Sequence, residues 1–362
     1  MRPFALVVFL SYIFLSVLRG NVGTDTLMYQ DMVLHPEFYK NIGLAYYFLS
    51  SLFYGLSHDP VVTVRLLSLL FFMPLGYILF QSDKKLLFLF FALLAPWFFQ
   101  LSMNTMRSGL AFSFFLLGLF LLTKQEKKSL YAGLFFFLFS TFVHISFLFP
   151  VLLAAPFLLD NGELKKILLT KKGVILIGIY LILLFLNYSA LHFFLPHTDQ
   201  ARSGSLIAQE FSKKVNLYKS FQAPSALSGT SRVVMIFLAL FLVFSLPSTK
   251  HHARFRKKFL YVFLSSLLFS FVVSRFSYAG LRLLDLVFLS SASMIFYYSM
   301  KNRDIVTKRV ERIALLLFFI SLLAFTRNFV NSARDYDTFG QSTATQSAFV
   351  PYRTLFEEKA AR

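Results

Sequence analysis

The sequence predicts an all-α polytopic membrane protein, and two observations carry this prediction. Of the 362 residues, 57% are apolar and 15% are charged, whereas globular chains run nearer to about 45–50% and 25%. The apolar residues also form runs of roughly 15–25 residues, the length that crosses about 30 Å of hydrocarbon. A soluble domain could not bury so much apolar surface, so the composition excludes cytosolic enzymes, secreted domains and disordered proteins.

The apolar runs predict eleven transmembrane helices within a single transmembrane domain over residues 1–362. The first run, within 1–20, is followed by no small-residue cleavage site, so we expect a retained span rather than a removed signal peptide. The other spans are expected at 61–81, 86–101, 105–123, 129–143, 145–159, 173–194, 231–247, 258–273, 279–299 and 312–328. The pair hinged at His144 could instead form one long bent span, but the basic loops that follow it argue against that reversal of topology.

Basic breaks between spans should face the cytoplasm, which places the amino terminus inside and the carboxyl terminus outside. With Arg2, these breaks hold more than half of the 36 Lys and Arg residues; they lie at 84–85, 124–128, 165–172, 250–258 and 301–312. Topology therefore explains much of the net charge of +19, and we expect no nucleic-acid partner. His251 and His252 fall in one of these breaks, and we read both as solvated.

Three longer segments then face outward, at 20–60, 195–230 and 329–362. Residues 20–40 lie outside and Lys84 lies inside, so an odd number of spans must separate them. The aromatic-rich segment 41–57 is therefore read as an interfacial helix on the outer surface, and 61–81 as the second span.

Ionisable groups near the outer span ends are costly there and are functional candidates by default. Asp25, in Gly23-Thr24-Asp25-Thr26, either caps a turn or accepts a proton from a substrate hydroxyl. His144 is either a hydrogen-bonded structural residue at the helix break or an acid–base group. Asp25 and His144 are thus the candidate catalytic residues.

Three arginines at the outer face are candidates for binding a diphosphate. Arg107 lies one turn into a span, where a guanidinium is unfavourable to the helix dipole unless an anion is present. Arg275 lies at the outer mouth, and Arg282 either pairs with Asp285 or joins the other two. Arginine with Tyr and His suits a diphosphate and sugar hydroxyls, so we add four candidate substrate-binding residues: Tyr29, Asn104, Tyr278 and Tyr352.

The absence of cysteine excludes disulfides, zinc–thiolate sites, iron–sulfur clusters and thiol nucleophiles. Motifs that hold metals or nucleotide phosphates are also missing, and the outer segments carry few acids. We therefore expect no metal and no cofactor.

The order of these motifs resembles the EpsG family, whose members are bacterial exopolysaccharide proteins related to Wzy-type O-antigen and capsule polymerases. The matching set is Gly23-Thr24-Asp25-Thr26 with Tyr29, Asn104-x-x-Arg107-x-Gly109-x-Ala111, His144-x-Ser146, Arg275 and Pro351-Tyr352. It covers nearly the whole chain, with only hydrophobicity matching over 160–260. Asp25, Arg107, His144 and Arg275 match the polar positions of the family, and Arg282 and Tyr352 match less closely.

The resemblance implies a GT-C-like membrane glycosyltransferase that joins undecaprenyl-diphosphate-linked oligosaccharide repeat units. The reaction would take place on the outer face of the bacterial inner membrane, with a flippase and a chain-length regulator as partners. Direct attack by an acceptor hydroxyl would invert the anomeric centre, and arginines would make a metal unnecessary. One alternative is another polyprenyl-carrier-dependent glycosyltransferase or ligase. The other is a lipid-linked sugar transporter, for which we would expect internal repeats and polar residues at the membrane midplane.

Overall fold

The computed structural model describes residues 2–19, 26–36, 43–98, 100–124, 126–160, 162–189, 240–247, 249–276, 279–302 and 306–331. This part of the chain is helical and contains no strand. Its elements are α1 (Arg2–Val17), α2 (Thr26–Leu34), α3 (Leu44–Ser57), α4 (Pro60–Gln81), α5 (Lys84–Leu94), η2 (Ala95–Trp97), the π-helix η3 (Gln100–Asn104), α6 (Met106–Leu122), α7 (Lys127–Val143), η4 (Ile145–Phe147), α8 (Leu148–Leu158), α9 (Gly162–Leu169), α10 (Lys171–Ser189), α14 (Lys250–Phe276), α15 (Ala279–Lys301) and α16 (Lys308–Asn331).

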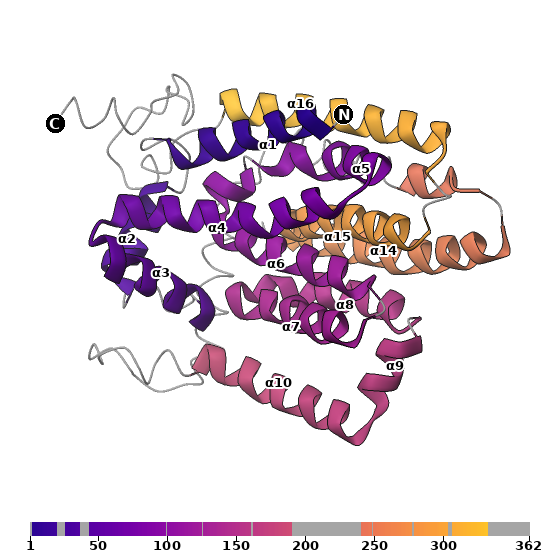
Figure 1. Ribbon diagram of the computed structural model, residues 1–362, viewed down its shortest axis with the longest axis horizontal. Coiled ribbons are helices and arrows are strands. Elements are labelled where there is room, and N and C mark those ends of the chain that lie inside the picture. Colours follow the sequence, from indigo (N-terminus) through magenta and orange to yellow (C-terminus); the bar gives the residue numbers. More distant parts are fainter. Residues whose placement is uncertain are drawn as a thin grey trace.

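The long helices run roughly along one axis, and the chain reverses between consecutive ones (Figure 1). Short turns with acidic caps produce two of these reversals. The Asp59 carboxylate accepts the Val61 N–H at 2.7 Å at the start of α4, and Asp83 accepts the Leu86 N–H at 2.9 Å at the start of α5. The bundle therefore has two distinct ends.

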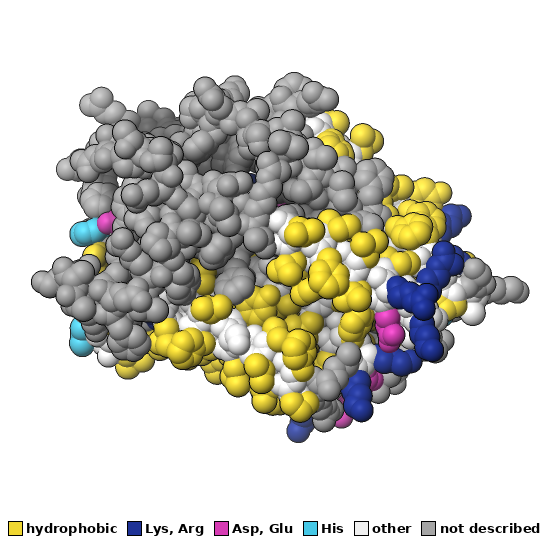
Figure 2. Space-filling model, turned by 90° about the horizontal axis from the view of Figure 1, so that it is seen from above, with side chains coloured by type: hydrophobic (Ala, Val, Ile, Leu, Met, Phe, Trp, Pro, Cys, Tyr) yellow, Lys and Arg dark blue, Asp and Glu magenta, His cyan; other side chains and the backbone are white. Residues whose placement is uncertain are grey.

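Basic side chains gather at one end of the bundle, which we call the basic end. Figure 2 shows Lys and Arg side chains together there, while apolar side chains cover the middle of the described surface. Lys84, Lys127 and Lys308 mark this end, each at the first residue of its helix. This segregation of charge is what the positive-inside pattern in the sequence requires of a bundle of antiparallel spans.

The opposite end carries α2 and α3, and we call it the α2/α3 end (Figure 1). The helices α4, α6, α8 and α15 begin there, and α1, α7 and α14 finish there. The interfacial segment 41–57 is helical from Leu44 to Ser57, and its length of about 21 Å is short of a membrane span. The helix α2 was not predicted; Tyr29, Met32 and Val33 give it a buried face.

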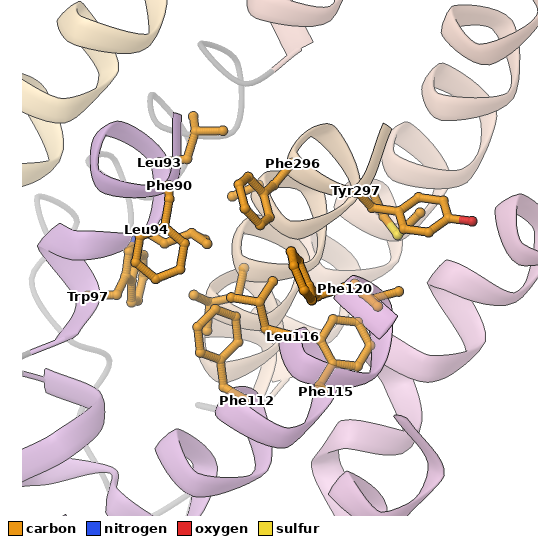
Figure 3. Packing of buried hydrophobic residues seen from close by; sticks show 14 of the residues in the cluster. Phe90, Leu93, Leu94, Trp97, Phe112, Phe115, Leu116, Phe120, Phe296 and Tyr297 are labelled. Carbon is orange, nitrogen blue, oxygen red and sulfur yellow. The ribbon is translucent and has the colours of Figure 1, made fainter. Parts of the chain in front are cut away.

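Two helices form the centre of the bundle. Every residue of α6 from Gly109 to Leu122 is buried, and so is every residue of α15 from Leu286 to Met300. Their aromatic side chains interlock with α5 and η2 (Figure 3): Phe90 meets Phe296 at 5.7 Å between centroids, and Trp97 stacks on Phe288 at 5.2 Å. In a lipid solvent such packing stabilises the helix bundle through van der Waals contact rather than through the removal of apolar side chains from water.

The outer helices leave large apolar side chains exposed, as a lipid-facing surface requires. Phe4 is 72% exposed, Phe80 66% and Leu323 70%. By length and composition, the described helices include two that could cross a membrane, at 60–81 and 282–301, and a third if the bent pair 145–158 and 162–169 is one span. The structure thus has the character of a helical membrane protein, and the count of eleven spans stays a prediction.

Most of the expected spans coincide with observed helices, but three expectations were wrong. The segment 86–101 is not one helix, because α5 ends at Leu94 and Pro96 begins a 3-10 turn. The basic stretch 250–258 is not a loop but the first turns of α14, and part of 165–172 lies in α9. Long Lys and Arg side chains support helix well, so a charge run alone does not end one.

A further correction concerns a single residue, His252, which is buried and not solvated. Only 3% of it is exposed, and its Nδ1 lies 2.8 Å from the Tyr298 hydroxyl on α15. The helical path of 250–258 turns this residue inward, toward the face where Phe255 stacks on Tyr298 at 3.7 Å. The expected segments 195–230 and most of 231–247 and 329–362 lie outside the described residues, and the single-domain division stays a prediction.

Candidate functional site

Ser102 of the π-helix η3 joins three parts of the chain at the α2/α3 end. Its hydroxyl lies 2.8 Å from that of Ser16 on α1, and its carbonyl oxygen accepts from Ser68 on α4 at 3.1 Å. The same carbonyl accepts from Nη1 of Arg19 at 2.9 Å. π-Helical turns are uncommon and occur frequently at functional sites. This one anchors α1 and α4 directly beside the start of α6.

Arg107 lies in the first turn of α6, just beyond this π-helix, and its side chain is half-buried. The turn is tight because α6 returns close to the π-helix: a Cβ on Gly109 would approach the Leu101 carbonyl oxygen to 2.1 Å. Glycine at this position therefore permits the backbone geometry that presents Arg107. The backbone of Asn104 ends the π-helix, and its side chain lies outside the described part.

Two buried arginines at this end were not predicted. Arg19, after the last turn of α1, is fully buried, and Arg65 on α4 is 4% exposed. Arg65 precedes Ser68 by one turn, so it shares the face of α4 that meets the π-helix and lies closer to the α2/α3 end. Its position inside the apolar run 61–81 was the available signal, because an arginine within a span is a functional candidate by default.

Tyr46 of α3 lies near Arg107 and Arg19. The side chain is fully buried, and its hydroxyl has no hydrogen-bond partner among the described residues. Burial raises the pKa of the Tyr46 phenol and the neighbouring Tyr29 reinforces this, while the positive charges of Arg107 and Arg19 oppose it. The Tyr29 and Tyr46 rings lie 6.3 Å apart. Tyr29, a predicted substrate-binding residue, is therefore brought beside Tyr46.

His144 lies at the break between α7 and η4, as predicted. Its Nδ1 accepts the Ser146 backbone N–H at 3.2 Å and lies 2.5 Å from the Ser146 hydroxyl, so the imidazole caps the 3-10 turn. An acceptor Nδ1 means that the neutral ring carries its proton on Nε2, a tautomer assigned from this network. His144 is half-buried. The structure thus gives it the capping role that the sequence left open.

The segment before α3 connects Tyr46 to the His144 region. Gly43 has a φ of +57°, and a Cβ on it would approach the Phe142 carbonyl oxygen to 2.8 Å. This close approach at a left-handed position requires glycine. It holds the start of α3 against the last turn of α7, one residue from the His144 break.

The remaining candidates fall into two groups. Arg275 lies in the last turn of α14, with its side chain outside the described part, and Arg282 is exposed in the first turns of α15, with Asp285 half-buried. Both helix ends lie at the α2/α3 end, and α15 packs against α14 and α6. Asp25, Tyr278 and Tyr352 lie outside the described residues, although Thr26, next to Asp25, is fully buried.

Comparison with known families decides the identity at the level of a family. The EpsG family matches residues 3–354, nearly the whole chain. The chain belongs to the EpsG family. This confirms the resemblance read from the ordered motifs, including the region 160–260 where only hydrophobicity matched. No curated protein and no solved structure matches the chain.

Membership in the EpsG family has a direct functional meaning. It implies a membrane protein of exopolysaccharide synthesis, generally a glycosyltransferase-like polymerase. The helical bundle with its exposed apolar side chains agrees with a membrane location.

Proposed function

We propose that this EpsG-family protein is a polysaccharide polymerase that joins undecaprenyl-diphosphate-linked oligosaccharide repeat units. The single observation that carries the proposal is the position of Arg107 at the junction of a π-helix and α6, near Tyr46. A diphosphate bound there would meet a guanidinium and the amino-terminal N–H groups of α6. Arg275 lies in the last turn of α14 and Arg282 in the first turns of α15, both at the same end of the bundle. Both would add positive charge there.

We also propose that the α2/α3 end faces outward from the bacterial inner membrane. Support comes from the segregation of Lys and Arg to the opposite end (Figure 2), which the positive-inside rule assigns to the cytoplasm. With eleven spans, the amino terminus is inside and the carboxyl terminus outside. O-antigen, capsule or exopolysaccharide repeat units would then meet the site after a flippase has moved them across.

The reaction would be a direct displacement at the anomeric carbon of the growing chain. The acceptor hydroxyl oxygen of a second repeat unit forms the new glycosidic bond, and the bond to the diphosphate of the first carrier breaks with that electron pair leaving on the diphosphate. Arg107 and Arg275 stabilise the departing charge, with Arg282 nearby, so the step inverts the anomeric centre and needs no metal.

Asp25 and His144 would have different roles in this reaction. Because Nδ1 of His144 accepts from Ser146, the Nε2–H edge is suited to donate to a diphosphate oxygen. Asp25 would accept the proton from the acceptor hydroxyl. The Tyr29, Asn104, Tyr278 and Tyr352 side chains would bind sugar hydroxyls.

The test is polymerisation of lipid-linked repeat units by the reconstituted full-length protein. We expect Arg107→Ala to lower the rate by at least about a hundredfold, because an oxyanion-type contact is worth roughly that much. Arg254→Ala, an exposed arginine at the basic end, is the matched control and should keep the wild-type rate. Full polymerisation by Arg107→Ala would overturn the proposal. Loss of the reaction after treatment with EDTA would overturn the metal-free mechanism.

Deletion of the gene separates the polymerase from a ligase acting on the same carrier. Loss of a polymerase leaves single repeat units on the lipid, whereas loss of a ligase leaves long unattached chains. A transporter would instead leave repeat units on the cytoplasmic leaflet, and the purified protein would form no glycosidic bond.

A further inference from the structure

We propose that exposed cations of α5 and α16 form a binding surface for an anionic phospholipid at the basic end. The surface, which we call the α5/α16 patch, contains five exposed cations: Lys84, Lys85, Lys308, Arg309 and Arg312. The inference goes beyond the proposed reaction and does not depend on it, because the patch lies at the opposite end of the bundle from Arg107.

The cations of the patch belong to two helices that pack against each other. Both α5 and α16 begin at the basic end, and they contact one another. The Lys85 Nζ donates to the Val306 carbonyl oxygen at 3.4 Å, and Val306 lies two residues before the first residue of α16. This hydrogen bond places the first turn of α5 beside the start of α16, so cations from both helices share one surface. Figure 2 shows Lys and Arg side chains at this end next to exposed apolar side chains.

The exposed face of α16 changes from cationic to apolar within one helical turn. Arg312 is exposed, and the next residues on the same face, Leu315 and Leu316, are exposed as well. The exposed apolar side chains continue at helical spacing into the second half of the helix: Phe319, Leu322 and Leu323. Such a stripe faces hydrocarbon, so the turn before it, about 5.4 Å along the axis, lies at the depth of the lipid head groups. Arg309 and Arg312 are therefore at the level of the lipid phosphates.

The charge of the patch is not neutralised within the described part of the chain. Four of its five side chains form no ion pair and no hydrogen bond there: Lys84, Lys308, Arg309 and Arg312. Two nearby acids leave the patch positive, because the Asp83 carboxylate caps α5 and Glu311 forms no ion pair with a described residue. By contrast, Lys258 at the same end lies 2.5 Å from the Asp160 carboxylate and donates to the Pro156 carbonyl oxygen at 3.0 Å.

This arrangement goes beyond what membrane topology requires. The positive-inside rule explains on which side of the membrane these cations lie, but not why they gather on one face. Lys308 and Arg312 are four residues apart in one helix, a spacing at which like charges destabilise each other. An anion from outside the chain would remove that repulsion.

An anionic phospholipid fits both the cationic and the apolar part of this surface. Its phosphate would accept hydrogen bonds from the guanidinium groups of Arg309 and Arg312, while the neighbouring lysines add positive charge. Its acyl chains would lie along the exposed stripe that begins at Leu315. A soluble anion would contact only the cations, and a lipid without net charge would leave their repulsion in place. The partner of the patch is therefore a phospholipid with a net negative charge.

The test measures binding of three probes to the purified full-length protein in detergent, by native mass spectrometry. The probes are dioleoyl phosphatidylglycerol, which is anionic, dioleoyl phosphatidylcholine, which has no net charge, and glycerol 3-phosphate, which has no acyl chains. We expect the wild type to bind phosphatidylglycerol at least about tenfold more tightly than phosphatidylcholine. Glycerol 3-phosphate at the same concentration should not displace the bound phosphatidylglycerol.

Two double variants form a matched pair. Lys84→Gln/Lys308→Gln should weaken phosphatidylglycerol binding at least about tenfold, because each cation near an anionic lipid contributes about fivefold. Lys127→Gln/Lys128→Gln is the control: it also removes two exposed lysines from a first helical turn at the basic end, and it should bind within about twofold of the wild type. Phosphatidylglycerol should raise the melting temperature of the wild type and the control more than that of the patch variant.

Substitutions of the arginines test the same surface through single exposed side chains. Arg312→Gln should weaken phosphatidylglycerol binding about fivefold, and Arg312→Lys, which keeps the charge, should restore most of it. Because Arg312 is exposed, this variant is expected to fold even if the double variant does not. The inference is wrong if Arg312→Gln binds phosphatidylglycerol as the wild type does, or if the control loses as much binding as the patch variant. Equal binding of the two lipids by the wild type would also overturn it, as would displacement by glycerol 3-phosphate.

Discussion

At the scale of single residues, His144 caps a backbone turn with one ring nitrogen, and the proposed function uses the other nitrogen. Its Nδ1 caps the 3-10 turn through the Ser146 N–H, while the opposite ring edge remains the part that would meet a ligand. The two roles use different nitrogens, so substitution can separate them.

We predict that His144→Asn preserves stability but not activity. The Asn side-chain oxygen can accept the Ser146 N–H and is among the best helix caps, whereas His144→Ala should cost about 1 kcal/mol of folding free energy. Polymerisation should fall at least about tenfold in both variants, because neither has a donor at the Nε2 position. Thermal unfolding and the reconstituted assay measure the two effects. An active His144→Asn enzyme would reduce the histidine to a cap.

Single residues also show where sequence reasoning misread a pattern. His252 was read as solvated because its neighbours are basic, yet it is buried against Tyr298. Arg65 was not among the candidates, yet it lies within an apolar run and is buried, which is the context that makes a charge informative. In both cases the neighbours along the chain differ from the neighbours in space.

At the scale of elements, the junction of η3 and α6 is the most constrained part of the α2/α3 end. The π-helix, the start of the central helix α6 and the close approach of Gly109 to Leu101 occur within the ten residues 100–109. The residues of the sequence motif Asn104-x-x-Arg107-x-Gly109 form this junction. Its spacing could be recognised in the sequence, but the π-helical turn that explains it could not.

We predict that Gly109→Ala lowers both stability and activity. The added Cβ would meet the Leu101 carbonyl at 2.1 Å, so the π-helix must shift and carry Arg107 with it. Gly55→Ala on α3 is the matched control, because its Cβ meets nothing within 4 Å and alanine favours helix by up to about 1 kcal/mol. Melting temperature and polymerisation rate are the readouts. A Gly109→Ala protein that equals Gly55→Ala in both would show that the close approach is not required.

At the scale of the whole molecule, the two ends differ in charge and in the chemistry that they present. The basic end carries the Lys- and Arg-rich turns between helices. The α2/α3 end contains buried arginines, buried tyrosines and the helix break at His144. A membrane between them would place the two groups in different compartments.

We predict that the two ends react differently with a membrane-impermeant maleimide. The natural chain has no cysteine, so single substitutions report without background. His35→Cys, exposed at the end of α2, should be labelled in intact spheroplasts, and Lys128→Cys, exposed at the start of α7, only after permeabilisation. The reverse pattern would invert the topology and remove the outward-facing site.

Composition and hydropathy were sufficient to predict a helical membrane protein, since lipid requires apolar runs and hydrogen bonds within each spanning helix. The order of the polar motifs was sufficient to indicate the EpsG family. Local signals also located the His144 break and the Arg107 motif. The convergence of Arg19 and Ser68 on the Ser102 carbonyl depended on tertiary structure, because residues 83 and 34 positions away from Ser102 become its neighbours only when α1, α4 and the π-helix pack. Hydropathy records what faces lipid, while the packing of helices decides which polar groups meet.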